Sequence, residues 1–523
     1  MIFLYLMTKA RAASFLTFGL LAALGTFLVL YATPQGLGLS DDSIAYIAGA
    51  RSILAGNGYR AIWLASNKPV THFPPGFSGV LAIVGLSGLD PLRGARFVNS
   101  LLFGANTFLL GFIGWRMTRS QLAGVLLAVL FLFNASMFRV HAVAMSEPLY
   151  IFFSLLGFIT FSNYFQTDRY RWLVLTGVFT ALSYLTRYAG LALFATFFLA
   201  LILLREDWRR RLTSAAVFLT GFAPFALAWG IRNKLAADNA TNRTLVYHPI
   251  TQENINTGIY NFSEFLVPFE TWRRALMKIP NLFAAVIFVI ALVLLVWVAH
   301  KGLKKFFQPA GESPEILSFT TALYIFGYLA SITATMLLFD ASTKFKLRIV
   351  SPLFIGLLTL LVFLLQWLWS RRAVYWRILS ALVTIFVLAL SAAGMTASVT
   401  QLRKGGQGYA SFVWFDSEAM AFLRGLPKDL QIYSNQPGPV YLYTDRAGYV
   451  LPDLVDPVTG LPRSGYEEGV AALRQDVLSG DAVLVLFKSG SESEDIQSIY
   501  MQLAEDLYLV HDTHGDKIYS AYP

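Results

Sequence analysis

Two adjacent aspartates, Asp41 and Asp42, open the stretch SDDSIAYIAGARSILAGNGY, residues 40–59, directly after an apolar run. The spacing of its apolar residues predicts a short helix lying at a membrane surface. Ser40 or Asp41 can act as its N-cap, and Gly56 fits its C-terminal end. The two carboxylates therefore either cap this helix and interact favourably with its dipole or act on a substrate.

The expected helix places three residues on one face. Asp42, Tyr46 and Gly49 follow each other at intervals of four and three, which brings them to the same side. The small Gly49 predicts room for a ligand beside the carboxylate.

Two further stretches carry groups capable of acid–base chemistry. THFPPGF contains His72, which the helix-starting role of its proline pair does not explain. RVHAVAMSEPLY contains Arg139, His141 and Glu147. Glu147 is flanked by a serine and a proline, so capping the helix that starts there is its alternative role.

Basic residues gather at the ends of later apolar runs. Arg187 stands in YLTRYAG, Arg232 in WGIRN, and Lys344, Lys346 and Arg348 in STKFKLRIVSP. Their partners are either lipid headgroups or a bound phosphate or pyrophosphate, whose oxygens match the guanidinium fork.

Composition defines the class of protein. Of 523 residues, 56% are hydrophobic and 14% charged, and the mean hydropathy is +0.56. These values indicate a polytopic membrane protein. The net charge of +10 then reflects basic cytoplasmic loops rather than nucleic-acid binding. The chain has no cysteine, which excludes disulfides and thiolate metal sites.

The hydropathy predicts about eleven transmembrane helices in residues 1–400. Basic loops place the N-terminus in the cytoplasm and the C-terminal segment outside. The first outer loop, with interfacial helices, covers 34–93, and a second large outer loop covers 232–279. The expected spans are 14–33, 94–115, 120–138, 147–165, 172–186, 188–204, 212–231, 280–299, 317–339, 349–369 and 377–397.

Residues 401–523 predict a small extracytoplasmic α/β domain. Its expected strands lie in LQIYSN, DAVLVLF and DLYLVHD. Helical patterns at 416–425, 465–478 and 494–505 stand between them. The stretch RKGGQGY at 403–409 predicts a linker.

The sequence lacks the motifs that mark several enzyme classes. It contains no His-Glu-x-x-His, no Walker motif and no dinucleotide fingerprint. Carboxylates and cations instead gather at the outer ends of spans. This combination suits transfer from a lipid-linked phosphate, since cations neutralise the leaving phosphate and a carboxylate accepts the proton of the attacking hydroxyl.

These residues resemble those of the GT-C superfamily of polyprenyl-phosphate-sugar-dependent glycosyltransferases. The likeness is greatest to the branch with protein O-mannosyltransferases and the lipid A aminoarabinose transferase. It covers roughly residues 14–370. Besides the first outer loop and THFPPGF, it includes SEPLYIFFSLLGF, YLTRYAGLALF, FALAWGIRN and RIVSPLFIGLL.

The resemblance implies an inverting transfer with an acidic residue of the first loop as base. Asp42 matches that residue by its spacing to Tyr46, and Asp41 is the alternative. Glu147 matches a second acidic position, and Arg348 a ligand of the donor phosphate. Phe73 stands where the family often has lysine, which weakens a phosphate-binding role for that loop.

The complete expected site has three parts. The catalytic group is Asp42, Asp41 and Glu147. The donor-phosphate group is Arg348, Lys344, Lys346, Arg187 and Arg232, and the substrate-binding group is Tyr46, His72, His141 and Arg139.

We expect no metal and no cofactor besides the lipid-linked sugar donor. The expected partners are membrane lipids, a polyprenyl-phosphate sugar, and an acceptor that is a glycan, lipid or protein, with no nucleic acid. The resemblance implies a bacterial inner membrane as the location of the protein. A lipid or glycan transporter or flippase, and a non-catalytic membrane scaffold, are the alternative functions.

Overall fold

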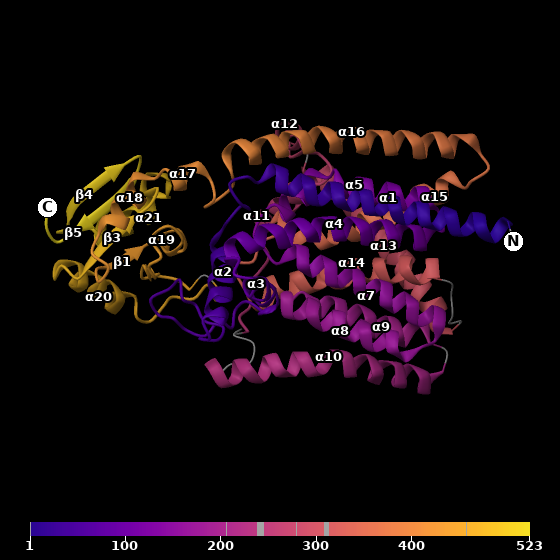
Figure 1. Ribbon diagram of the computed structural model, residues 1–523, viewed down its shortest axis with the longest axis horizontal. Helices are drawn as coiled ribbons and strands as arrows, with labels where there is room; N and C mark the ends of the chain where they lie inside the picture. The colour runs from indigo at the N-terminus through magenta and orange to yellow at the C-terminus, as the bar shows by residue number, and fades with distance from the viewer. Residues whose placement is uncertain (1, 206, 238–244, 279, 308–312, 457) are drawn as a thin grey trace. The chain divides into compact units, whose positions relative to one another are not determined.

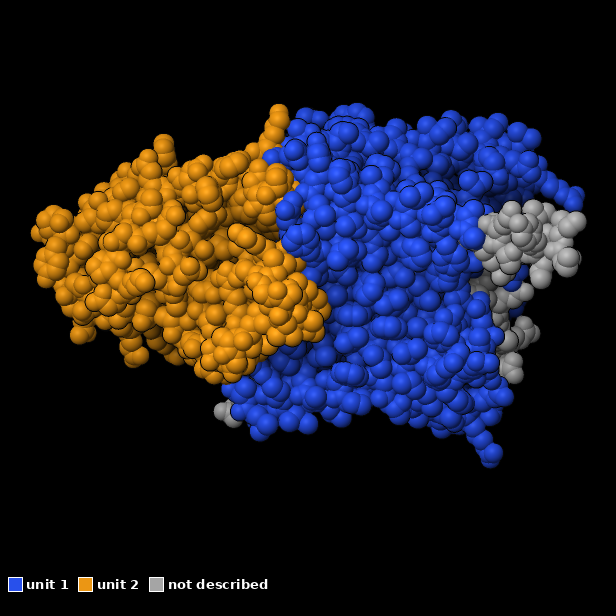
Figure 2. All heavy atoms as spheres, in the orientation of Figure 1, with its two compact units in different colours: residues 1–32, 71–77, 96–403 blue, residues 33–70, 78–95, 404–523 orange. Residues whose placement is uncertain are grey.

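The computed structural model (Figure 1) describes the whole chain apart from residues 1, 206, 238–244, 279, 308–312 and 457. The chain divides into two compact units (Figure 2). Unit 1 comprises residues 1–32, 71–77 and 96–403, and unit 2 comprises residues 33–70, 78–95 and 404–523. Unit 2 therefore combines most of the first outer loop with the C-terminal segment. The domain boundary expected near residue 400 stays a prediction.

Unit 1 is built from helices. They are α1 (Ile2–Ala32), α4 (Pro91–Thr118), α5 (Gln121–Leu132), α6 (Ala135–His141), α7 (Glu147–Thr167), α8 (Tyr170–Thr186), α9 (Gly190–Leu204), α10 (Trp208–Ala237), α11 (Gln252–Ser263), α12 (Glu270–Leu276), α13 (Pro280–Phe307), α14 (Ser313–Leu338), α15 (Leu347–Trp369) and α16 (Val374–Gly405). The first five residues of α4 belong to unit 2.

All eleven expected spans coincide with helical segments, and the polytopic helical architecture is confirmed. Within the described residues, eight helices are long and apolar enough to cross a membrane, and the α5–α6 pair, bent by 66°, makes a ninth. Two expected spans fall on shorter helices, because α8 has 17 residues and α9 has 15. A full span needs about 20.

Glycines allow α8 and α10 to pack closely. A Cβ on Gly177 would collide with the carbonyl of Phe218, and a Cβ on Gly221 with the carbonyl of Val174. Small residues allow the two backbones to approach, as in many membrane helix pairs. This contact helps to fix α8, whose C-terminal end carries Arg187.

Unit 2 contains α2 (Asp41–Leu54), most of α3 (Gly76–Gly85), and a small α/β domain. The elements of that domain are α17 (Phe412–Phe415), α18 (Glu418–Gly425), β1 (Gln431–Ser434), α19 (Pro437–Thr444), β2 (Tyr449–Val450), α20 (Tyr466–Leu478), β3 (Ala482–Leu486), the 3₁₀ turn η1 (Ser489–Ser491), α21 (Glu494–Leu503), β4 (Tyr508–Thr513) and β5 (Asp516–Ser520).

The five strands form one sheet in the order β2-β1-β3-β5-β4. β1 pairs in parallel with β2 and β3, and β5 pairs antiparallel to β3 and β4. Val483 and Val485 of β3 face one hydrophobic cluster, while Leu484 and Leu486 face another. β3 is therefore buried on both sides, which explains its continuous apolar sequence.

The three expected strands and three expected helices of this domain are confirmed, but β2, β5 and α19 were not predicted. The signal for β5 is the turn before it. His514 and Gly515 both have positive φ, 53° and 87°, as in the two-residue turns that favour hairpins.

Candidate active site

A buried ion pair lies at the centre of the candidate site in unit 1. The side chain of Glu147 is 0% exposed, and its Oε1 lies 2.7 Å from Nη1 of Arg187. Nη1 of Arg348 lies 4.0 Å from the same oxygen. Among the described residues, neither carboxylate oxygen accepts a well-aligned hydrogen bond. One carboxylate thus faces two guanidinium groups, and none of the described residues donates a hydrogen bond to Oε2.

Helix ends supply all three residues. Glu147 is the first residue of α7, whose N-cap is Ser146 and which has proline at an early position, as expected from the sequence. Arg187 is the C-cap of α8 and also donates to Ser146 Oγ at 3.2 Å. The two arginines are only partly exposed, at 18% for Arg187 and 30% for Arg348.

A proline in α15 explains the geometry around Arg348. Pro352 has no amide hydrogen, so the carbonyl of Arg348 loses its usual helical donor. Ser351 Oγ donates to that carbonyl at 2.7 Å. The hydroxyl of Tyr328 donates to the next carbonyl, Ile349, at 2.8 Å. Side-chain hydroxyl groups therefore supplement the backbone hydrogen bonds at the start of α15.

The His72 segment lies against the same helix end. The hydroxyl of Tyr188 donates to the carbonyl of Thr71 at 2.8 Å and accepts from Nε1 of Trp229 at 3.1 Å. A Cβ on Gly76 would lie 2.7 Å from the carbonyl of Leu185, so the chain passes close to the α8–α9 turn. This places the segment that contains His72 beside the turn that contains Arg187.

A tyrosine pair lies one turn below Glu147. The hydroxyls of Tyr150 and Tyr324 are 2.8 Å apart. Both line a small cavity of about 30 Å³ between α4, α7, α14 and α15, which is large enough for about one water molecule.

The aspartate pair occupies the first turn of α2 in unit 2. Ser40 is the N-cap, and its amide donates to Ser43 Oγ at 3.1 Å. Gly56 follows the helix with φ of 76°. Both expected ends of this helix are confirmed. Asp41 Oδ1 accepts a hydrogen bond from the hydroxyl of Tyr409 at 2.7 Å.

The expectation that Gly49 leaves room for a ligand is wrong. A Cβ on Gly49 would collide with the ring of Tyr59, which fills this space, and would lie 3.4 Å from Ser78 Oγ. Tyr46, on the same face, is 3% exposed, and Ser78 Oγ donates to its carbonyl at 3.0 Å. This face of α2 is therefore packed against protein.

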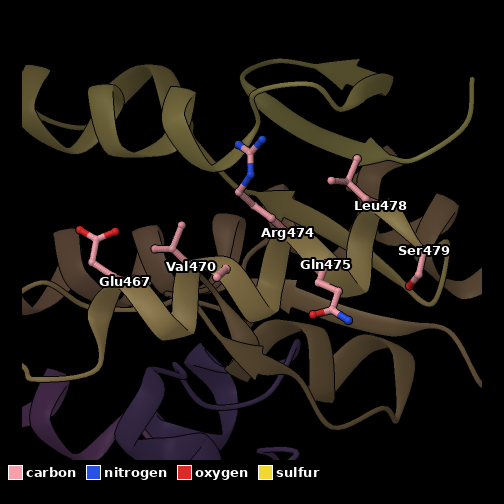
Figure 3. A pocket seen from close by; sticks show the side chains of 7 residues that line it. Glu467, Val470, Arg474, Gln475, Leu478 and Ser479 are labelled. Carbon is pink, nitrogen blue, oxygen red and sulfur yellow. The ribbon is translucent and has the colours of Figure 1, made fainter.

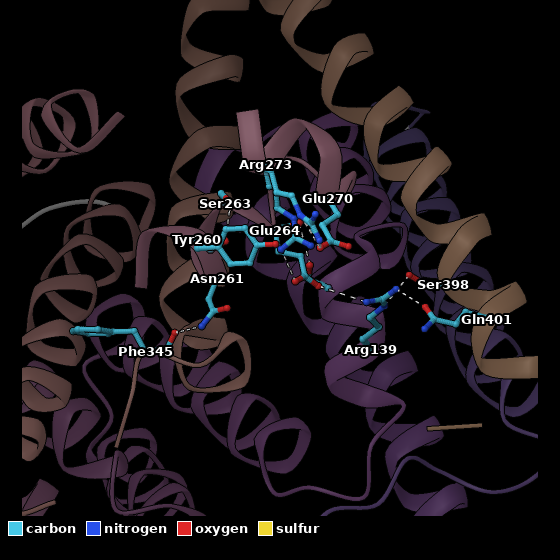
Figure 4. A network of polar contacts seen from close by, with 12 residues as sticks. Arg139, Tyr260, Asn261, Ser263, Glu264, Glu270, Arg273, Phe345, Ser398 and Gln401 are labelled. Carbon is cyan, nitrogen blue, oxygen red and sulfur yellow. Dashed lines mark hydrogen bonds and ion pairs between the residues drawn. The ribbon is translucent and has the colours of Figure 1, made fainter. Parts of the chain in front are cut away.

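Arg139 belongs to a network of polar contacts in unit 1 (Figure 4). Its guanidinium donates to Ser398 Oγ at 3.0 Å and Gln401 Oε1 at 2.9 Å, and it lies 3.7 Å from Glu264 Oε1. Arg273 Nη1 lies 2.9 Å from the other oxygen of Glu264. Glu264 thus links Arg139 of α6 to Arg273 of α12, a role that the sequence pattern did not suggest.

His141 is 0% exposed. Its Nδ1 lies 2.7 Å from the carbonyl of Met137 and its Nε2 lies 3.1 Å from Nδ2 of Asn106. These distances fit a neutral ring that donates through Nδ1 and accepts through Nε2. Substrate contact by Arg139 and His141 stays a prediction, although both side chains already contact protein groups.

The remaining expected cations lie elsewhere in unit 1. Arg232 lies over the ring of Trp229, 5.1 Å from its centroid, and donates to Asn233 at 3.0 Å. Lys344 and Lys346 are exposed in the turn before α15.

A shallow groove runs along α20 in unit 2 (Figure 3). Arg474, one of the residues that line it, donates to Asp506 Oδ2 at 2.9 Å and to the carbonyl of Gln502 at 3.0 Å. None of the residues that line the groove belongs to the expected site. In the described part of the chain, no three His, Cys, Asp or Glu side chains gather in a way that could hold a metal ion.

Comparisons with known proteins agree with this architecture. The family model of dolichyl-phosphate-mannose-protein mannosyltransferases matches residues 86–230, a segment that contains Glu147 and Arg187. No curated protein matches the chain.

Three solved structures are similar over nearly the whole chain. ArnT from Cupriavidus metallidurans, bound to undecaprenyl phosphate, has a TM-score of 0.50 and 14% identity over 96% of this chain and 97% of that chain. The Archaeoglobus fulgidus oligosaccharyltransferase with Zn and sulfate has a TM-score of 0.57 and 12% identity over 96% and 73%. AglB from the same organism, with an inhibitory peptide and a dolichol-phosphate, has a TM-score of 0.52 and 12% identity over 92% and 70%.

The chain therefore has the fold of the GT-C membrane glycosyltransferases. The fold that the first-loop and span motifs implied is confirmed.

Proposed function

We propose that the protein is a membrane glycosyltransferase that moves a sugar from a polyprenyl-phosphate donor to a glycan, lipid or protein acceptor. The observation that carries the proposal is the cluster of one buried carboxylate and two guanidinium groups. Glu147 Oε1 lies 2.7 Å from Arg187 and 4.0 Å from Arg348. Its net positive charge suits a phosphate, and Oε2 suits a hydroxyl donor because no described group donates to it.

The cluster is preorganised to stabilise the negative charge that develops on the leaving phosphate during transfer. Guanidinium groups that a buried carboxylate already holds need little reorganisation when a phosphate leaves. Two bidentate contacts would fix the phosphate in one orientation. The likeness in fold to ArnT, which was solved with undecaprenyl phosphate, supports a lipid phosphate as the ligand.

The proposed reaction is a single inverting displacement. The oxygen of the acceptor hydroxyl attacks C1 of the sugar, and the bond between C1 and the phosphate oxygen breaks. The electron pair stays on that oxygen as polyprenyl phosphate leaves, next to Arg187 and Arg348. The hydroxyl proton passes to a carboxylate of the Asp41–Asp42 pair. The proposal includes no resident metal ion, and it places the aspartate pair and the α/β domain on the extracytoplasmic side.

Turnover of lipid-linked sugars tests the proposal. Purified protein with a panel of labelled polyprenyl-phosphate sugars and membrane-derived acceptors is expected to release polyprenyl phosphate. Arg187→Gln and Arg348→Gln should lower this rate by roughly 100-fold each, in the range for loss of one charge-stabilising group. Arg371→Gln is the control, since Arg371 lies over the Trp367 ring at the far end of α15.

Absence of turnover with every donor would contradict the proposal, and so would equal rates for the three variants. A topology reporter inserted at residue 450 should lie outside. A cytoplasmic signal would refute the proposed orientation.

A further inference from the structure

We propose that Tyr409, just after α16, is a positioning residue that holds Asp41 in place and leaves Asp42 as the proton acceptor. The inference rests on the proposed function and adds to it the identity of the base and a role for the C-terminal segment. All its contacts lie within unit 2.

The first step is the hydrogen bond at the tip of α2. The hydroxyl of Tyr409 lies 2.7 Å from Asp41 Oδ1 and 2.8 Å from Gln436 Oε1. One hydroxyl proton cannot serve both acceptors, so the charged carboxylate takes it. Gln436 completes the contact when its amide turns its NH₂ group toward the phenol oxygen. Asp41 is thus tied to Tyr409, which in turn contacts Gln436 of the same segment.

The second step is that Tyr409 stays a donor. Burial, followed by the nearby Asp41 carboxylate, raises the pKa of Tyr409 well above its usual range. The phenol is therefore neutral throughout the physiological range and donates to Asp41 at every working pH.

The third step is that Tyr409 is itself fixed. Its amide donates to the carbonyl of Leu39 at 3.0 Å, and the amide of Leu39 donates to the carbonyl of Gln407 at 3.2 Å. Gly408 has φ of 59°, and a Cβ there would collide with the carbonyl of Leu39. The stretch expected to be a linker therefore forms an ordered bridge to the residues just before the aspartate pair.

The fourth step is that α2 is held along its length. Ile44 and Ala48 pack in one cluster with Tyr441 of α19. Near the other end, Arg51 donates to the hydroxyl of Tyr441 at 3.4 Å and pairs with Asp90 at 2.9 Å. The helix is therefore fixed in position by the C-terminal domain, and Tyr409 orients the Asp41 carboxylate at its N-terminal end.

Successive residues of a helix point about 100° apart. The Asp41 and Asp42 side chains therefore leave the helix in different directions, and Asp41 is the one that accepts the hydrogen bond from Tyr409. Asp41 accepts the Tyr409 hydroxyl, while Asp42 is partly exposed in the first turn and acts on Tyr409 through its charge. The pair divides into a docking carboxylate and a base.

A matched pair of tyrosines tests the inference. Tyr433 forms the same kind of contact elsewhere in the domain, since its hydroxyl donates to Asp476 Oδ2 at 2.7 Å. Tyr409→Phe should lower kcat by roughly 10- to 100-fold, as expected for small misplacement of a reacting group, with donor KM changed less than twofold. Tyr433→Phe should leave kcat unchanged. Equal effects of the two substitutions on kcat would overturn the inference.

Amide substitutions at the aspartates test the same inference without altering Tyr409. Asp41→Asn keeps a hydrogen-bond acceptor and should retain at least a tenth of kcat, while Asp42→Asn should lose at least 100-fold. The reverse order would make Asp41 the base and overturn the inference while the proposed function stands. A wild-type chain without transfer activity would instead contradict the proposed function.

Discussion

Removing Arg187 alone should be at least as costly as removing the whole Glu147–Arg187 ion pair. The perturbations are Arg187→Gln, Glu147→Gln and the double variant. In the first, a carboxylate that is 0% exposed keeps only Arg348, 4.0 Å away. In the second, Arg187 keeps 18% exposure and can turn toward solvent. In the double variant two neutral amides of similar shape can bond to each other.

The distances set the magnitudes. At an effective dielectric constant of about 20, unit charges 2.7 Å apart attract by about 6 kcal/mol, and at 4.0 Å by about 4 kcal/mol. Desolvation offsets much of this, so loss of one partner of a buried pair costs about 3 kcal/mol for Arg187→Gln. Glu147→Gln should cost about 1–2 kcal/mol, because its partner reaches solvent. The double variant should lose about 2–3 kcal/mol, which leaves a coupling of about 2 kcal/mol.

The assay is thermal unfolding of the purified protein in one detergent, followed by tryptophan fluorescence. For a chain of this length, 1 kcal/mol shifts Tm by about 1–2 °C. Arg187→Gln should therefore lower Tm by about 3–6 °C, and the double variant should not fall below it. If the Tm shifts of the two single variants simply add in the double variant, the ion pair contributes nothing to stability. The proposal that Glu147 holds the arginines in place before the substrate binds would then be refuted.

Three other results are expected. Gly49→Ala should destabilise the protein by about 1–3 kcal/mol through overpacking, seen as a lower Tm, and a second substitution, Tyr59→Ala, should make the glycine change harmless; a lasting penalty would contradict the packing described. Glu264→Gln should speed hydrogen exchange across residues 252–276, because one carboxylate balances two arginines there, and unchanged exchange would count against the network. Because folding raises the pKa of Tyr409, its contribution to stability is complete below the unfolded value of about 10 and declines as pH rises above it. Tm measured from pH 8 to 11 should therefore fall more steeply for wild type than for Tyr409→Phe, and parallel curves would refute this.

The sequence predicted what depends on local pattern. Long apolar runs located the helices of unit 1, and Ser40 and Gly56 marked both ends of α2, because capping needs only neighbouring residues. The small strands β2 and β5 were missed. β2 has two residues, too few to show an alternation of apolar and polar side chains. β5 covers only the five residues DKIYS, and its clearest signal is the His514–Gly515 turn that precedes it.

Contacts between residues that are far apart in the chain could not be predicted from local sequence patterns. Tyr409 meets Asp41 across 368 positions, and Arg139 meets Ser398 across 259, so no window of periodicity contains both partners. The Gly49 expectation failed for a related reason. A small residue shows that something approaches closely, but the sequence does not say whether it is a ligand or, as here, the ring of Tyr59.

For the carboxylates of Asp41 and Glu147, too, the sequence did not distinguish a capping role from a functional one. Asp41 and Glu147 both stand at the first position of a helix, and position alone made capping a sufficient explanation for each. The structure gives Asp41 a neutral hydroxyl donor, so its charge is satisfied by docking. Glu147 is buried, faces two guanidinium groups, and has an oxygen to which no described residue donates. Burying an unfilled acceptor is costly, and a substrate hydroxyl or phosphate-bound water would offset that cost. Unfilled bonding capacity, rather than place in the helix, therefore supports the proposed functional role of Glu147.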